Sequence, residues 1–495
     1  MIFRVLIVAV GVLVSLKTTA QAPITNYKFV FKINNLPDSL KGDVFMANYY
    51  GSKQYYFDTA RFDKTGTVVF AGDTIKGGIY SIILSDRKSY FEFVVNEPSI
   101  EMETRMGDFV KSMKVKKSEE NKKFYEYLAY IEDKSAEAAP LKSKLETAEG
   151  AEKESIEEKL AKIDEEVIAY KKKFIADNPD LFISKVFKAS ADPEVPEFDE
   201  IEDEEARKLK RYMAYKKAYL KDVDFGDERL LRTPVLHNKL VYYMTKVVPQ
   251  LPDSVIKAAD EIIARAAPSK EVHKYVVHTI TSKFEDSKVM GMEAVLVHMG
   301  LNYYCPDKAW WLNKKKLDEF CERVNHMAPL LIGKQAPDLI LPDTEGKWRR
   351  LYDVDSKFTV LYFWDSGCGH CKKVTPKLKE FYEEYKDKGV AVYAVGTEFE
   401  NKDWLKYIEK NQLPFINVSD NPEINKNAHE LIRQGVTTVE SLNFRDTYDI
   451  FSTPKIFLLD ENKKIIATRL MPEQMGEFID RLLDEELKSK NEIEN

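Results

Sequence analysis

Cysteine is the residue type in this sequence best suited to chemistry, and two of the four cysteines stand close together. Cys368 and Cys371 form the motif Cys-Gly-His-Cys, in which two residues separate the reactive side chains. A pair with this spacing can close a disulfide with little backbone movement, and it can exchange that disulfide with another protein through a mixed disulfide. The motif therefore predicts thiol-disulfide exchange, with Cys368 as the nucleophile and Cys371 as the resolving thiol.

Other uses of a Cys-x-x-Cys motif fit this sequence less well. A zinc site needs further ligands, and neither a second Cys-x-x-Cys nor a His-x-x-His lies within reach in the sequence, so we expect no metal and no cofactor. A haem-attachment motif would require histidine at the position of Lys372. A purely structural disulfide between such near neighbours would stabilise the fold little, because it closes a short segment of chain.

The elements around the motif predict a sheet of parallel strands. Apolar strands are expected at 359–364 and 390–395, with a helix at 372–386 between them. This order implies a right-handed crossover and places both cysteines where a strand turns into a helix. Unpaired N–H groups and the helix dipole at such a turn stabilise a thiolate. The elements expected next are a helix, three strands and a helix, at 401–410, 414–418, 455–459, 465–470 and 475–486.

Residues beside the cysteines are expected to support this chemistry. When protonated, His370 supplies a positive charge that favours the thiolate of Cys368 and moves the couple toward oxidising potentials, and Gly369 permits a tight turn. Asp365 is the nearest candidate proton acceptor for Cys371, although capping of the loop is the simpler role for a carboxylate at that position.

Two segments resemble the TlpA/ResA-like branch of the thioredoxin superfamily. They are F-W-D-S-G-C-G-H-C-K-K-V-T-P around the cysteines and S-T-P-K-I-F-L-L-D further on, and the resemblance covers residues 333–487, including an insertion at 421–448. It implies an α/β thioredoxin-like fold. It also implies that Pro454 has a cis peptide bond and lies against the cysteines, that Thr453 borders the substrate-binding edge, and that Trp364 forms a wall of the site.

The sequence departs from that family at two positions that matter for proton transfer. Tyr362 stands where thioredoxin has a buried aspartate, and Val374 stands where some members have an active-site glutamate. The resemblance therefore leaves the proton acceptor for Cys371 unassigned.

The chain as a whole is long enough for several domains. It has 495 residues and a formal net charge of -7 without an extended basic stripe, so we expect no nucleic-acid partner. We predict a multidomain protein with an N-terminal antiparallel β domain, sandwich-like, at 24–115, a central all-α domain at 116–329, and the α/β thioredoxin-like domain at 330–490.

Hydrophobic periodicity supports the first two of these domains. Apolar residues alternate with polar ones from Tyr27 to Ile33, as in a half-buried strand, and recur at heptad spacing over 156–174, as in a packed helix. Another helix is expected at 307–326. Cys305 and Cys321 lie sixteen residues apart, and both a disulfide and two buried thiols remain open.

Residues 1–20 have the pattern of a secretory signal peptide. Arg4 precedes an apolar run at 5–14, and small residues at 18–20 favour cleavage near Ala20. The run is too short for a typical bilayer span. We therefore expect an exported protein of the periplasm or cell envelope, with proteins that carry disulfides or dithiols as its substrates and a membrane-bound electron donor as a further candidate partner.

The expected function is that of an exported thiol-disulfide oxidoreductase, and two alternatives remain. The β and helical regions, which resemble those that precede such modules in some Gram-negative envelope proteins, could make it a binding or sensing protein with an auxiliary redox module. A peroxiredoxin-like peroxidase shares the fold and the A-P-D leader, but it needs threonine where this sequence has Asp365.

Overall fold

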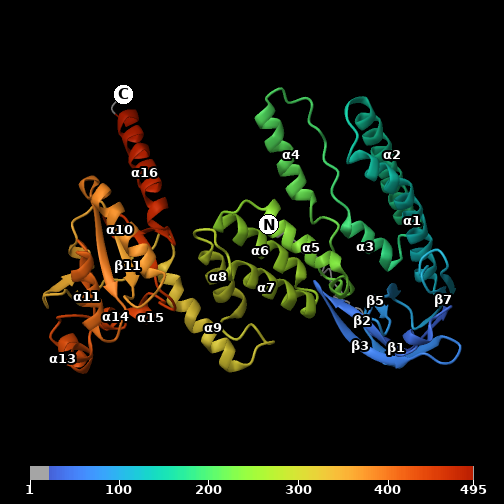
Figure 1. Ribbon diagram of the computed structural model, residues 1–495, viewed down its shortest axis with the longest axis horizontal. Coiled ribbons are helices and arrows are strands. Elements are labelled where there is room, and N and C mark those ends of the chain that lie inside the picture. The colour runs from blue at the N-terminus through green and yellow to red at the C-terminus, as the bar shows by residue number, and fades with distance from the viewer. Residues whose placement is uncertain (1–21, 494–495) are drawn as a thin grey trace, which may run out of the picture. The chain divides into compact units, whose positions relative to one another are not determined.

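The computed structural model describes residues 22–493 and divides the chain into two compact units (Figure 1). The first unit holds residues up to Pro249 together with Lys257–Thr279, and the second holds Gln250–Ile256 together with the residues from Ile280 onward. The expected signal peptide at 1–20 lies outside the described residues. Within 22–493, no helix combines the length and the apolar character that a membrane crossing requires.

The first unit begins with two four-stranded sheets, in the orders β4-β1-β7-β8 and β3-β2-β5-β6. All strand pairs in them are antiparallel except β1–β7, which is parallel. Phe31 of one sheet packs on Phe93 of the other with ring centroids 4.8 Å apart, so the sheets share one core. The predicted N-terminal β fold is therefore confirmed. The strands are β1 Ile24–Asn34, β2 Asp43–Tyr50, β3 Lys53–Arg61, β4 Thr67–Ile75, β5 Gly78–Ile83, β6 Tyr90–Val95, β7 Ser99–Arg105 and β8 Lys114–Lys117.

Helices follow the β strands. Ile156, Ile163 and Phe174 of the predicted heptad stripe are buried, and Tyr170 stacks on Tyr130 of the preceding helix with ring centroids 3.8 Å apart. The central helical region is therefore confirmed. Its helices are α1 Glu119–Leu145, α2 Gly150–Asp177, α3 Phe182–Ser190, α4 Glu204–Ala218, α5 Pro234–Tyr242, α6 Pro252–Ala266 and α7 Lys270–Glu285, and a π-helical turn, η3 Tyr243–Val247, continues α5.

The second unit contains two more helices before its sheet, α8 Glu293–Met299 and α9 Lys314–Met327. The start predicted for this helix, residue 307, is wrong: α9 begins at Lys314, after Asn313, whose side chain caps it. Asp307 has a positive φ of 52°, which a helix does not allow. Cys305 and Cys321 form a disulfide with their Cα atoms 6.0 Å apart. This pairing decides between the two alternatives that their spacing left open.

The sheet of the second unit has five strands in the order β13-β12-β11-β14-β15. Strands β11, β12 and β13 are parallel, and β14 runs antiparallel to β11 and β15. The predicted strand-helix-strand order and crossover are present. The elements are β11 Phe358–Trp364, α10 Cys371–Tyr385, β12 Val390–Gly396, α11 Asn401–Asn411, β13 Ile416–Val418, β14 Lys455–Leu459, β15 Ile465–Thr468 and α16 Pro472–Ile493.

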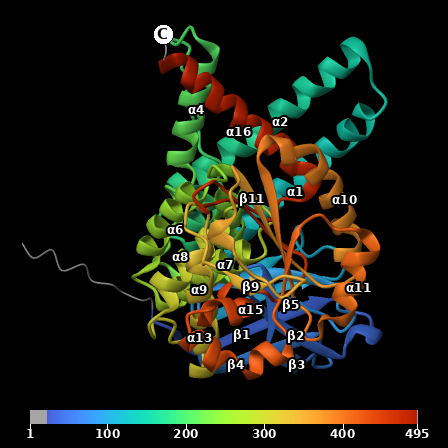
Figure 2. The ribbon, with the colours of Figure 1, turned by 90° about the vertical axis from the view of Figure 1, so that its left-hand side faces the viewer.

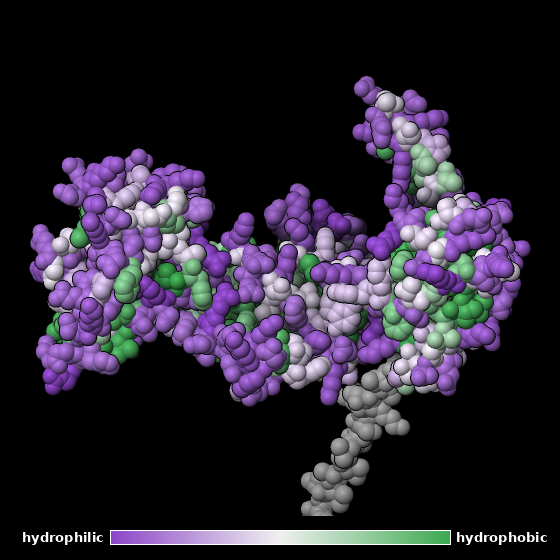
Figure 3. Space-filling model, turned by 60° about the horizontal axis from the view of Figure 1, so that its bottom comes forward, coloured by the Kyte–Doolittle hydropathy of each residue, from purple (hydrophilic) through white to green (hydrophobic). Residues whose placement is uncertain are grey.

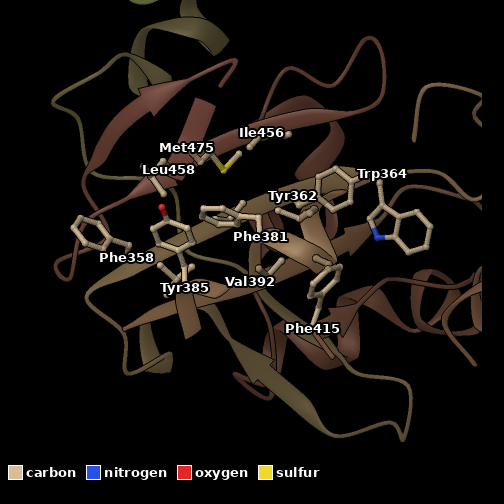
Figure 4. Close-up of a cluster of buried hydrophobic side chains, with 14 of the residues drawn as sticks. Phe358, Tyr362, Trp364, Phe381, Tyr385, Val392, Phe415, Ile456, Leu458 and Met475 are labelled. Carbon is tan, nitrogen blue, oxygen red and sulfur yellow. The ribbon is translucent and has the colours of Figure 1, made fainter. Parts of the chain in front are cut away.

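Both faces of this sheet are covered, because every residue of β11 is buried. Tyr362 and Trp364 face a core with Leu378 of α10 and Met475 of α16, and part of this core is drawn in Figure 4. The neighbouring Phe363 faces the opposite side, where residues of the 330–351 leader and of the insertion cover the sheet. In Figure 2, α10 and α11 are the orange helices at the right. The predicted α/β thioredoxin-like fold is confirmed.

Polar side chains cover most of the face that Figure 3 shows, where purple predominates over green. This agrees with a composition in which 32% of residues are charged.

Candidate active site

The two cysteines lie at the predicted strand-to-helix turn. Strand β11 ends at Trp364, and Cys371 is the first residue of α10. Both are free thiols, and they differ in burial: Cys368 is partly exposed, whereas the exposed fraction of Cys371 is 0%. An approaching disulfide can therefore reach Cys368 but not Cys371.

The carboxylate of Asp365 caps the turn before Cys368. Its Oδ1 accepts hydrogen bonds from the backbone N–H groups of Gly367, at 2.6 Å, and Cys368, at 3.1 Å. The structure therefore places Asp365 in the loop-capping position. Its own backbone N–H points to the sulfur of Cys371, at 3.5 Å.

Hydrogen bonds around Cys368 favour its thiolate. Partial burial raises the pKa of Cys368, but hydrogen bonds from the backbone N–H groups of Cys371 and His370 and from the side chains of Thr453 and Cys371 outweigh it, so the net pKa lies below its ordinary value. The sulfur lies 3.3 Å from the carbonyl oxygen of Thr453, to which the protonated thiol donates. The helix start thus acts on Cys368 as the sequence predicts.

The two residues between the cysteines, Gly369 and His370, are both exposed. His370 is exposed, and its backbone N–H is the group that acts on the sulfur of Cys368. At Gly369 the backbone is not left-handed, and a Cβ there would meet nothing within 4 Å. The turn therefore does not require the conformational freedom of glycine at this position, which corrects the sequence-based interpretation.

Burial raises the pKa of Cys371 to about 11. The hydroxyl of Tyr362 lies 2.8 Å from Oγ1 of Thr375, which donates in turn to the carbonyl oxygen of Cys371, also at 2.8 Å. Because Thr375 uses its proton on that carbonyl, Tyr362 donates to Thr375. This pair of hydroxyls offers Cys371 no carboxylate. Val374 packs against the adjacent core.

Two further predicted site residues, Thr453 and Pro454, lie just before β14. The Thr453–Pro454 peptide bond is cis, as the resemblance implies, and the Thr453 carbonyl contacts Cys368. Trp364 has an exposed fraction of only 1% and stacks on Tyr362 with ring planes 5° apart. It therefore forms part of the core beneath the turn.

Sequence reasoning missed one ionisable residue beside the cysteines, Glu398. Its Oε1 accepts a hydrogen bond of 2.5 Å from the backbone N–H of Ser366, in the turn that leads to Cys368. The available signal was an acidic residue just after β12, because the carboxyl ends of the parallel strands β11 and β12 meet at one edge of the sheet. Within residues 22–493, no group of three or more His, Cys, Asp or Glu side chains is arranged to hold a metal ion.

Comparisons with protein families identify two regions of the chain. Residues 332–468 match the AhpC/TSA family, and this segment contains both cysteines and the turn between them. Residues 27–124 match a domain of unknown function, DUF4369, and this segment runs from within β1 to beyond the end of β8.

The C-terminal region is similar to individual proteins that are named for thiol-disulfide chemistry. The chain is 30% identical over 157 residues to the thiol-disulfide oxidoreductase ResA of Bacillus thuringiensis, an alignment that covers 32% of this chain and 77% of that protein. It is 29% identical over 154 residues to ResA of Geobacillus thermodenitrificans, covering 30% and 78%. A solved domain of a possible thiol-disulfide isomerase from Cytophaga hutchinsonii is 40% identical and covers 33% of this chain and 99% of that one, with a TM-score of 0.28.

The contrast between the two thiols predicts selective alkylation. We expect iodoacetamide to modify Cys368 near neutral pH faster than a free cysteine, because each unit by which the pKa falls raises the thiolate fraction there about tenfold. Cys371 should stay unmodified in the folded protein. Peptide mass spectrometry after timed alkylation measures both, and preferential modification of Cys371 would contradict the assignment.

Proposed function

The chain belongs to the family of thiol-disulfide oxidoreductases that includes ResA, and from that premise we propose that it exchanges electrons with protein dithiols and disulfides through Cys368 and Cys371. The observation that carries the proposal is the contrast within the pair. The pKa of the partly exposed Cys368 is lowered by N–H groups at the start of α10, while that of the buried Cys371 is raised.

The exchange proceeds in two displacements. In the reducing direction, the Cys368 thiolate attacks one sulfur of a client disulfide and forms a mixed disulfide, and the other client sulfur leaves as a thiolate and takes up a proton. Cys371 then loses its proton and attacks Cys368, which releases the second client sulfur. The client gains two electrons and two protons, and the enzyme is left with a Cys368–Cys371 disulfide. The oxidising direction reverses these steps.

Five neighbouring residues have supporting roles in this proposal. Asp365 fixes the turn, the backbone N–H of His370 stabilises the thiolate, and Thr453 with Pro454 forms the edge along which a client chain lies. Trp364 holds the turn from beneath. The hydroxyls of Tyr362 and Thr375 provide no carboxylate to accept the Cys371 proton in the second displacement.

The proposed location is the periplasm or cell envelope. It is supported by the pattern of residues 1–20 and by a disulfide between Cys305 and Cys321, because such bonds persist in oxidising compartments. A membrane-bound electron donor would return the enzyme to the dithiol state.

Peroxide reduction is a second candidate function, because the C-terminal region matches the AhpC/TSA family. The residue three positions before Cys368 is Asp365, whereas a peroxiredoxin requires threonine there. Thiol-disulfide exchange is therefore favoured.

Serine variants test the two roles. We expect Cys368→Ser to abolish insulin reduction and Cys371→Ser to accumulate mixed disulfides with client proteins, since only the second displacement is blocked. Non-reducing electrophoresis of cell extracts, followed by identification of the trapped proteins, measures this. Cys368→Ser is the matched control, and the same adducts in that variant would disprove the assignment.

Substrate preference separates the two functions. The full chain should reduce insulin disulfides at least tenfold faster than hydrogen peroxide under the same reductant. Comparable turnover of peroxide would favour the peroxidase instead.

The lowered pKa of Cys368 predicts an oxidising couple, because stabilising the thiolate stabilises the reduced form. We expect a reduction potential nearer to that of protein disulfide isomerase, about -180 mV, than to that of thioredoxin, about -270 mV. Titration against glutathione buffers measures the potential, and a value at or below that of thioredoxin would contradict this prediction.

A further inference from the structure

Glu398 is a half-buried carboxyl group beside the active-site turn. It lies two residues beyond the end of β12, and its Oε1 accepts the 2.5 Å hydrogen bond from the backbone N–H of Ser366. Its other oxygen, Oε2, is buried and has no hydrogen-bond partner. A carboxylate with one unpaired buried oxygen is costly, which favours the protonated form.

Two carboxyl groups thus bracket one turn. Asp365 accepts hydrogen bonds from the N–H groups of Gly367 and Cys368. Glu398 accepts a hydrogen bond from the N–H of Ser366, which lies between Asp365 and Gly367 in the chain. Burial raises the pKa of Glu398, and the nearby charge of Asp365 raises it further. Together these contacts hold three consecutive backbone amides of the segment that presents the Cys368 sulfur.

The insertion fixes the loop that carries Glu398. Arg445, in the short helix α15 Phe444–Thr447, donates to the carbonyl oxygen of Thr397 at 3.0 Å and that of Glu398 at 3.4 Å. Its guanidinium also donates two hydrogen bonds of 3.0 Å to the carboxylate of Asp420, a residue that is only 2% exposed. A bidentate pair of this kind restrains both partners. Thr397 in turn donates its N–H to the carbonyl oxygen of Trp364, at the end of β11.

We propose that Glu398 is a positioning residue of the redox site, which holds the Ser366–Cys368 turn in the reactive geometry and couples its own protonation to the reactivity of Cys368. The proposal rests on the assignment of Cys368 as the nucleophile. A neutral Glu398 holds the turn without opposing the thiolate. An ionised Glu398 adds a negative charge near the sulfur and disfavours the thiolate as pH rises.

Charged groups on several elements face the same region and set the strength of this coupling. The open hollow beside the turn is lined by acidic and basic residues of both signs, so the effect of Glu398 is that of one charge among partly compensating neighbours. Besides Asp365 and Glu398, the titratable and charged groups that line this hollow are Lys372 of α10 and Glu400, Asp403, Lys406, Tyr407 and Lys410 of the β12–α11 loop and α11. Arg445 of α15 contacts the Glu398 carbonyl oxygen and pairs with Asp420 after β13.

The test is the pH profile of Cys368 alkylation by iodoacetamide in the full chain, with Glu398→Gln as the main variant. The glutamine amide oxygen can still accept the Ser366 N–H but cannot ionise. We expect this variant to react about three- to tenfold faster than the wild type near pH 7 and to lose one ionisation from the profile.

Glu400→Gln is the matched control, because it removes an equal charge from an exposed residue two positions along the chain. It should change the rate by less than about twofold. An unchanged profile in Glu398→Gln, or an equal shift in Glu400→Gln, would overturn the coupling.

Glu398→Ala tests positioning separately from charge. It removes both the charge and the acceptor for the Ser366 N–H, so its limiting rate with insulin at high pH, where Cys368 is fully ionised, should fall about tenfold, whereas Glu398→Gln keeps the wild-type limit. Equal limiting rates in the two variants would refute the positioning role. Circular dichroism checks folding, and if the alanine variant does not fold, Glu398→Leu replaces it, because leucine also removes the acceptor for the Ser366 N–H but keeps a similar side-chain volume. A wild-type Cys368 that alkylates normally but exchanges with no disulfide would instead refute the proposed function.

Discussion

The site depends on holding two sulfurs, three residues apart, in opposite electrostatic environments. In the proposed mechanism Cys368 reacts as a thiolate, and N–H groups at the start of α10 lower its pKa. Cys371 must stay neutral until the mixed disulfide forms, and burial in the apolar core ensures this. The turn before α10 presents the Cys368 sulfur at the surface, so we expect the hydrogen bonds of its backbone to control the reactivity of the pair.

Several segments distant in sequence converge on that turn. Strand β11 leads into it, the loop after β12 supplies Glu398, and the residues before β14 supply the Thr453 carbonyl. Parallel pairing of β11 with β12 brings the first two together, and antiparallel pairing of β11 with β14 brings the third. The insertion adds Arg445, which braces the β12 loop from outside the sheet. The order of the strands therefore determines which residues contact the turn that holds Cys368.

The cysteine pair and its setting could be predicted from the sequence, because the motif and the hydrophobic periodicity are local signals. Glu398 could not, since its importance comes from a contact with Ser366 thirty-two residues away. The start of α9 was misplaced because helical periodicity does not reveal the positive φ of Asp307. The pairing of Cys305 with Cys321 was undecidable for a similar reason: spacing sets which cysteines could meet, whereas tertiary packing sets which do.

That second disulfide has a consequence for how electrons are counted. The described chain holds two dithiol couples, one poised for exchange and one joining the residue before Pro306 to α9. A reductant strong enough to open the Cys305–Cys321 bond as well takes the molecule from two free sulfhydryls to four, and two further electrons are consumed. Stoichiometry measured with such a reagent therefore overstates the capacity of the working pair twofold, unless the Cys305–Cys321 bond is followed separately.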